Sequence, residues 1–284
     1  MSRNQGSWTL RAGRHNLELS EKSLIMGVLN VTPDSFSDAG RYLSPENALS
    51  RAREMVEEGA HIIDVGGESS RPFAEPVSPE EEKRRVLPVI KALADELTIP
   101  VSIDSYHPEV VREAIEAGAS IINDISGLGD SRMRELAAQS GLPVVLMHMK
   151  GTPRNMQKDP HYVDVVREIT TFFNQRMRLA IEAGVSEKQL ILDPGIGFGK
   201  TPLHNLQILG RLEEFAELGR PLLIGTSRKS FIGALQGTEV DERLMGSLAS
   251  VVAARMKGVA LFRVHDVRES RLALEMVDAI LGSS

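Results

Sequence analysis

The chain has 284 residues, of which 42% are hydrophobic and 25% charged, an ordinary composition for a globular protein with a sizeable core. This length is at the upper end for one domain and is typical of a single α/β barrel. The net charge of −6 argues against a general nucleic-acid partner. The absence of cysteine excludes thiol catalysis, disulfides and cysteine-ligated metals.

Residues 1–20 are polar, without an apolar run of signal-peptide length. No later stretch approaches the roughly 18 uncharged apolar residues of a membrane span. We therefore expect a soluble, cytoplasmic protein with no membrane partner. Because no linker interrupts the chain, we expect one domain over residues 1–284.

From residue 24 onward a short apolar run, a polar or glycine-rich loop and an amphipathic helix follow one another repeatedly. Continuous apolar runs suit strands that are buried on both faces of a parallel sheet. The predicted strands are residues 24–29, 61–65, 100–103, 120–123, 143–147, 190–192, 221–224 and 259–262. The predicted helices are residues 45–58, 79–97, 108–117, 131–140, 162–183, 203–218, 241–256 and 267–281.

Eight strands that alternate with eight helices predict an α/β fold of the (β/α)8 TIM-barrel type. An open, doubly wound sheet is the alternative that the same pattern allows. Residues 1–20 precede the first strand, and we expect them to form a hairpin or loop that covers the barrel floor, the end at which the strands begin.

In a barrel the functional residues lie on the loops that follow the strands. Polar residues finish all eight predicted strands, whereas the helix-to-strand turns are mostly Gly, Ala and Pro. The polar strand ends are Asn30, Asp64, Asp104, Asn123, His148, Asp193, the Ser227-Arg228-Lys229 run and the Arg263-Val264-His265 run. This asymmetry predicts a site at the strand ends.

Three short acceptor side chains, Asp104, Asn123 and Asp193, follow strands three, four and six. They suit a planar, nitrogen-rich ligand, because a carboxylate accepts two parallel N–H bonds from an amidine-like edge. Lys229 could donate to a carbonyl or nitrogen of the same ring. Each acid could instead cap a helix, as Asp104 could before Pro108. The convergence of several such residues favours a ligand.

The last strand carries the opposite charge. Arg263 and His265 alternate and point the same way, whereas Val264 turns into the packing. The last strands of a barrel commonly build an anion site, and Arg263 can bind a phosphate with two parallel bonds. The alternative for Arg263 is an ion pair with Asp266 or Glu269, and Arg228 could simply face solvent.

The stretch 190–201, LILDPGIGFGKT, ends like a phosphate-binding P-loop. The spacing excludes that site, because Pro194 occupies the position of the required first glycine. We interpret the stretch as a buried strand that delivers Asp193 into a loop whose glycines allow other backbone or a ligand to approach closely.

Two long polar loops, residues 30–38 and 66–74, follow the first two strands. We interpret them as lids that close over a substrate, with plain surface loops as the alternative. No His/Glu group has zinc spacing, so a protein-caged transition metal is not expected. A Mg²⁺ ion held mainly by phosphate and water is still compatible with the sequence, with Asn30 or a lid aspartate as one ligand.

Five blocks in order resemble the dihydropteroate synthase family, and the resemblance runs from about residue 24 to the C-terminus. They are residues 29–38 (LNVTPDSFSD), 64–72 (DVGGESSRP), 193–200 (DPGIGFGK), 227–230 (SRKS) and 263–266 (RVHD). The resemblance implies an enzyme of folate synthesis that joins 6-hydroxymethyl-7,8-dihydropterin pyrophosphate to 4-aminobenzoate and releases pyrophosphate. Sulfonamides compete with the aminobenzoate in that family.

Carried over by position, the resemblance implies four groups of site residues. The pterin would contact Asp104, Asn123, Asp193, Lys229, Met147, Phe198 and Gly225. The pyrophosphate would contact Asn30, Arg263, Val264 and His265, with Mg²⁺ as the cofactor and Asn30 as its protein ligand. The aminobenzoate would contact Ser70, Arg71, Pro72 and Ser230. Lys229, Arg263, His265 and Asp104 would be the catalytic residues.

The family also implies that pyrophosphate leaves first and that the aniline nitrogen captures a cationic pterin methylene. Because the family is usually dimeric, we expect a homodimer. The small-residue run 246–254 could form a close helix contact between subunits or pack on the barrel.

The second lid departs from the family pattern. It reads Ser69-Ser70-Arg71-Pro72-Phe73, whereas the family has Ser-Thr-Arg-Pro-Gly. Because Phe73 would lie beside the aminobenzoate entrance, we expect altered sulfonamide binding with activity retained. Unchanged sulfonamide inhibition in Phe73→Gly would contradict this.

Two other functions remain as rivals. One is a pterin-binding methyltransferase that shares the barrel, and the other is a non-catalytic paralogue that binds pterin. The SRKS and RVHD blocks favour an anionic leaving group over methyl transfer. The complete set of strand-end residues argues against a loss of activity.

Overall fold

Eight parallel strands form one sheet in the computed structural model, which describes residues 8–19, 22–32, 45–69 and 74–283. Neighbouring strands are hydrogen-bonded in the order β8-β7-β6-β5-β4-β3-β10-β9. The strands are β3 (Leu24–Asn30), β4 (Ile62–Gly66), β5 (Val101–Asp104), β6 (Ile121–Asp124), β7 (Val144–Met147), β8 (Leu190–Asp193), β9 (Leu223–Ile224) and β10 (Leu261–Val264). A bridge between Leu192 and Leu222 joins the two ends of this order. The TIM barrel is confirmed, and the open doubly wound sheet is wrong.

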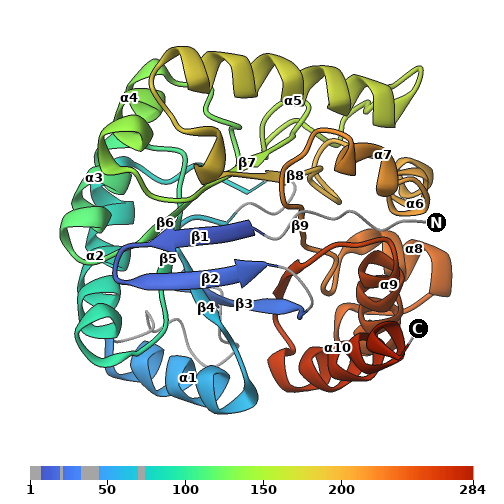
Figure 1. The fold of residues 1–284 in the computed structure, drawn as a ribbon, viewed down its shortest axis with the longest axis horizontal. Helices are drawn as coiled ribbons and strands as arrows, with labels where there is room; N and C mark the ends of the chain where they lie inside the picture. Colours follow the sequence, from blue (N-terminus) through green and yellow to red (C-terminus); the bar gives the residue numbers. More distant parts are fainter. Residues whose placement is uncertain (1–7, 20–21, 33–44, 70–73, 284) are drawn as a thin grey trace.

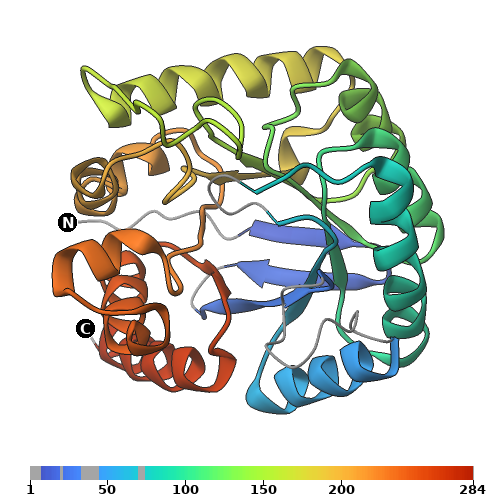
Figure 2. The same cartoon turned by 180° about the vertical axis from the view of Figure 1, so that it is seen from behind.

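Helices form a ring outside the strands in both views (Figures 1 and 2). They are α1 (Pro45–Glu58), α2 (Pro79–Glu96), α3 (Pro108–Glu116), α4 (Ser131–Ser140), α5 (Val165–Glu182), α6 (Pro202–Gly210), α7 (Glu213–Ala216), α8 (Ser230–Gln236), α9 (Leu244–Met256) and α10 (Val267–Gly282). Local signals explain several starts. The Ser78 side chain accepts from the backbone N–H of Glu81 before α2, and Pro79 is its first helical residue. Among the described residues no helix is long and apolar enough to cross a bilayer.

Two helix predictions differ from the structure. The expected helix 203–218 is divided into α6 and α7, because the chain leaves helical geometry at Arg211, where φ is −128°. The helix α8 was not predicted. It spans seven residues and ends at Gly237 with φ of +68°, and so short a helix has too few turns to give a periodic pattern.

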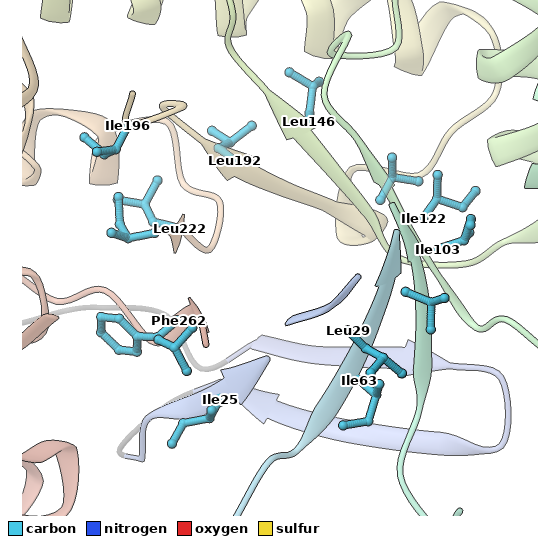
Figure 3. Packing of buried hydrophobic residues seen from close by; sticks show 14 of the residues in the cluster. Ile25, Leu29, Ile63, Ile103, Ile122, Leu146, Leu192, Ile196, Leu222 and Phe262 are labelled. Atoms are coloured by element: carbon cyan, nitrogen blue, oxygen red, sulfur yellow. The ribbon is translucent and has the colours of Figure 1, made fainter. Parts of the chain in front are cut away.

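Alternate residues of each strand face opposite sides of the barrel wall. The outward ones, including Ile25, Ile63, Ile103 and Phe262, pack against the helices in one large buried cluster (Figure 3). The inward residues near the strand starts form a second cluster, here called the floor layer: Met26, Ile62, Ile121, Val145, Ile191, Leu223 and Leu261. Seven of the eight barrel strands are therefore apolar on both faces where they begin, whereas β5 has the buried Ser102 at this level.

An antiparallel hairpin, β1 (Trp8–Ala12) and β2 (His15–Leu19), covers this floor layer. The hairpin buries Leu10, Ala12, Leu17 and Leu19 in the same cluster as the floor residues. In Figure 1 it crosses the centre of the ring of helices. The predicted hairpin at the barrel floor is confirmed, and the opposite end of the barrel is left for the site.

Candidate active site

Beyond the floor layer, most of the inward side chains change from apolar to polar. We call these positions the mouth layer: Asn30, Asp64, Asp104, Asn123, Met147, Asp193, Gly225 and Arg263. Ile62 precedes Asp64, Ile121 precedes Asn123, Ile191 precedes Asp193 and Leu261 precedes Arg263. Because the side-chain period of a strand is two, the eight strand ends bring these residues to one mouth. The structure therefore brings most of the predicted polar strand-end residues together at one end of the barrel.

Arg263 is held between two carboxylates at the centre of the mouth layer. Its Nε donates to Asp64 Oδ2 at 2.6 Å and one terminal nitrogen donates to Asp104 Oδ2 at 2.7 Å. Asn123 Nδ2 donates to the same Asp64 oxygen at 3.0 Å. The alternative partner Asp266 instead pairs with Arg228 at 2.5 Å. Arg263 therefore joins the site, and Arg228, which could have faced solvent, holds the loop after β10.

Burial sets the protonation of these groups. It raises the pKa of Asp104 to about 7, although Arg263 opposes this shift. Burial acts to lower the pKa of Arg263, but the carboxylates of Asp64 and Asp104 outweigh it and raise the pKa. The arginine stays charged, and one of its two partners, Asp104, is an acid that burial makes costly to ionise.

Asp193 lies at the end of β8, which β9 separates from β10, and is 6% exposed. Its Oδ1 accepts the backbone N–H of Gly195 at 2.7 Å. Burial raises the pKa of Asp193 to about 6, and the hydrogen bond from Gly195 limits that rise. A ligand edge with two N–H donors would supply the hydrogen bonds that this buried carboxylate otherwise lacks.

The glycines after Asp193 serve contacts within the protein. A Cβ on Gly195 would lie 2.0 Å from the carbonyl oxygen of His148, and one on Gly199 would lie 2.5 Å from that of Lys150. Both glycines have positive φ, +69° and +62°. Of the two partners that the sequence allowed, other backbone is the one that approaches here.

Lys200, in the same stretch, is buried, with an exposed fraction of only 2%. Its Nζ donates to the carbonyl of Phe198 at 2.8 Å and lies 3.0 Å from His148 Nδ1. Burial lowers the pKa of Lys200 to about 7, and burial together with Lys200 lowers that of His148 to about 2. The lysine that resembled a phosphate ligand instead fastens the loop to the segment after β7.

An apolar surface lies beside the acids. Met147 and Phe198 form a buried cluster with Ile125 and Met156. Lys229 Nζ lies 4.1 Å from the centre of the Phe198 ring, a distance suited to a cation–π contact. A flat ring could therefore meet an apolar face here while its edge reaches Asp193.

The loops after β9 and β10 are in contact with each other. His265 Nδ1 lies 3.1 Å from Ser227 Oγ, and burial followed by the charge of Arg263 lowers the pKa of His265 to about 3. Val264 is buried in the outer core, as its alternation predicted. Ser230 is exposed at the first position of α8, next to Lys229.

Oxygen atoms suited to a hard cation lie near Gly66, at the ends of β3 and β5. An atom added to Gly66 would lie 3.5 Å from Asn30 Oδ1 and 3.6 Å from Asp104 Oδ2, so Asn30 and Asp104 flank this glycine. Asp64 is fully buried, and its Oδ1 has no hydrogen-bond partner in the described part of the chain. This donor set fits Mg²⁺, which prefers carboxylate and amide oxygens.

Some predicted residues fall outside the described ranges: Ser70, Arg71 and Pro72 of the aminobenzoate group, Phe73, and the first loop from Pro33 onward. From the sequence, Asp64 is predicted to end a strand, but no role follows for it. Its position two residues after Ile62 on the inward face was the signal that could have placed it beside Arg263.

Comparison with known proteins agrees with this geometry. A family model described as pterin binding enzyme matches residues 26–265. The dihydropteroate synthase of Escherichia coli K12 is 48% identical over 268 residues, which cover 94% of this chain and 95% of the relative.

Two solved structures extend the likeness to the fold. The dihydropteroate synthase of Yersinia pestis in a sulfonamide drug complex has a TM-score of 0.93 at 44% identity, covering 96% of this chain and 99% of that one. The Xanthomonas albilineans enzyme with 4-aminobenzoic acid has a TM-score of 0.92 at 42% identity, covering 97% and 99%. This chain belongs to the dihydropteroate synthase family of pterin-binding enzymes.

Proposed function

We propose that the mouth layer binds one substrate of the dihydropteroate synthase reaction, the pterin pyrophosphate, with its pterin over β5–β8 and its pyrophosphate over β10 and β3. The observation that supports this division is the placement of Asp193 and the apolar cluster at the ends of β6–β8, with Arg263 and His265 at the end of β10. The chain would work as a single domain over residues 1–284.

The pterin ring would lie against Met147 and Phe198, with Gly225 leaving room beside it. Asp193 would accept two N–H bonds from the aminopyrimidinone edge, and Asn123, Asp104 and Lys229 would bind the remaining ring atoms. The buried, raised-pKa carboxylate of Asp193 supports this role, because paired N–H donors favour its ionised form. The pterin ring would lie between Phe198 and Lys229, whose Nζ already contacts the Phe198 ring.

The pyrophosphate would lie near Arg263, Val264, His265 and Asn30. His265 is neutral at physiological pH, so it would donate one N–H without adding charge. Asn30 and the unpartnered oxygen of Asp64 would hold Mg²⁺, which when bound would withdraw charge from the departing pyrophosphate. Arg263 would transfer part of its pairing from Asp104 to the phosphate oxygens, which frees that carboxylate for the pterin.

Capture of the pterin methylene by the aniline needs little base catalysis, because an aniline nitrogen is only weakly basic. Asp104 and Asp193 would stabilise positive charge that develops on the pterin as pyrophosphate leaves. The aminobenzoate would enter beside Ser230, with Ser70, Arg71 and Pro72 completing its site. We further propose a homodimer located in the cytoplasm.

One assay tests the proposal: the protein is mixed with the pterin pyrophosphate, labelled 4-aminobenzoate and Mg²⁺, and dihydropteroate is measured. Product is expected, and its absence from a folded sample would end the proposal. Asp193→Ala should then weaken pterin binding strongly, whereas Arg263→Ala should mainly weaken binding of the pyrophosphate end. An unchanged pterin affinity in Asp193→Ala would contradict its role.

A further inference from the structure

Three metal-ligand atoms from separate elements point at one another beside the mouth layer. They are Oε2 of Glu68, which follows β4, Oε2 of Glu82 in α2, and Nε2 of His107, which precedes α3. The three atoms lie within 4.8 Å of one another. The sequence does not predict this cluster, because Glu68, Glu82 and His107 are too far apart in the chain to match the ligand spacing of a zinc motif.

Each of these atoms is buried without a hydrogen-bond partner among the described residues. Glu82 is the most informative of them, since it is 1% exposed. A buried carboxylate oxygen without a donor is costly, and native proteins rarely leave one so. Burial raises the pKa of Glu82 to about 7, although a hydrogen bond with Ser105 and the nearby His107 oppose this rise.

The separations fit an ion better than direct hydrogen bonds. His107 Nε2 lies 3.6 Å from Glu68 Oε2 and 3.9 Å from Glu82 Oε2, too far for either oxygen to accept a hydrogen bond from it. Ligand bonds of about 2.1 Å around a tetrahedral ion separate neighbouring ligand atoms by about 3.4 Å. A small contraction of the cluster would therefore complete the coordination.

The surroundings orient the ligands. Tyr106 donates its hydroxyl to the other oxygen of Glu68 at 3.0 Å, which leaves Oε2 directed toward the cluster. Hydrogen bonds of this kind to a ligating carboxylate fix its position at metal sites. A cavity of about 10 Å³, room for about one water-sized ligand, lies between Glu68, Glu82 and Tyr106 of this region and Asp104 of the mouth layer.

We propose that Glu68, Glu82 and His107 bind a divalent transition-metal ion, with Zn²⁺ as the best match to one imidazole and two carboxylates. Two carboxylates and a neutral imidazole carry a charge of −2, which a divalent ion neutralises. The ion would join the loop after β4, helix α2 and the start of α3. This site is separate from the Mg²⁺ position at Asn30, because its ligands include nitrogen and do not include Asn30 or Asp64.

The test is calorimetric titration of the chelator-treated full chain with ZnCl₂ in excess Mg²⁺, which occupies oxygen-only sites. One equivalent should bind, and the melting temperature should rise by about 5 °C when free Zn²⁺ is about 100-fold above Kd. His107→Gln and Glu82→Gln should each weaken binding at least about tenfold. Tyr106→Phe, which cannot touch the ion, should weaken it less.

Matched controls are Glu80→Gln, an exposed glutamate in the same first turn of α2, and His161→Gln, an exposed histidine elsewhere. Both should bind Zn²⁺ as the unaltered chain does. The proposal is overturned if the unaltered chain binds no stoichiometric Zn²⁺, or if His107→Gln and Glu82→Gln both bind it with unchanged affinity. The readout is independent of synthase activity.

Discussion

The floor layer and the mouth layer lie at successive levels inside the same barrel and differ in polarity. The floor layer is apolar, whereas most mouth-layer side chains are polar or charged. On β8, Ile191 is fully buried among apolar neighbours under the hairpin, whereas Asp193 is a buried carboxylate with a raised pKa. Successive inward positions lie only about 7 Å apart along a strand. We infer that the start of β8 contributes stability through Ile191, whereas its end contributes Asp193 to the proposed substrate site.

The mouth layer reduces stability at neutral pH. The folded pKa values of Asp104 and Asp193, about 7 and about 6, lie above those of an unfolded aspartate. For an acid, a raised folded pKa means that its ionised form is less favourable in the folded state. Its relative stabilisation is therefore greatest at low pH and is lost as pH rises through the folded pKa. The apolar floor must offset this cost.

The largest effect is expected when the ion pairs of the mouth layer are broken. Arg263→Met would leave Asp64 buried without its cation, and we expect a loss of about 3 kcal/mol in unfolding free energy. Turnover should fall by about 10²- to 10³-fold, because a donor to the leaving group is removed. Urea unfolding and steady-state rates measure the two effects.

The control for this variant is Arg228→Met, which breaks the more exposed pair with Asp266. It should cost about 1 kcal/mol or less in stability. A wild-type rate in Arg263→Met would show that the centre of the mouth layer does not act on the substrate.

A smaller effect is expected at the loop that supports Asp193. In Gly195→Ala the new methyl group would meet the carbonyl oxygen of His148, and we expect a stability loss of about 2 kcal/mol in thermal unfolding. Gly141→Ala is matched, because Gly141 has a similar φ of +66° and open space around it. It should cost only about 1 kcal/mol. Equal losses would mean that backbone conformation, and not the contact with His148, requires the glycine.

The pH dependence of pterin binding should be smaller still. If the ionised Asp193 accepts two N–H bonds, affinity should be constant above pH 7 and about tenfold weaker at pH 5, one unit below its pKa of about 6. Calorimetry with the pterin pyrophosphate from pH 5 to 8 measures this. Asp193→Asn should lose that dependence, and an unchanged profile in this variant would assign the titration to another group, such as Asp104.

The sequence predicted the features that depend on local pattern. Continuous apolar runs identified each barrel strand, and period-two alternation placed Arg263 inward and Val264 in the outer core. What it could not predict depends on side chains far apart in the chain. The pairing of Arg263 with Asp64 spans 199 positions, and the burial of Lys200 depends on the carbonyls of a neighbouring loop. Helix α8 was missed because its seven residues are too few to show a period.

The most direct test of the separation between floor and mouth compares Ile191→Ala with Asp193→Asn on the same strand. Ile191→Ala should lose about 3 kcal/mol of stability and retain pterin affinity at a temperature where it is folded. Asp193→Asn should lose pterin affinity by at least about tenfold, with a melting temperature at pH 8 equal to or above that of the unaltered chain. Affinity retained in Asp193→Asn, or lost equally in Ile191→Ala, would contradict the account.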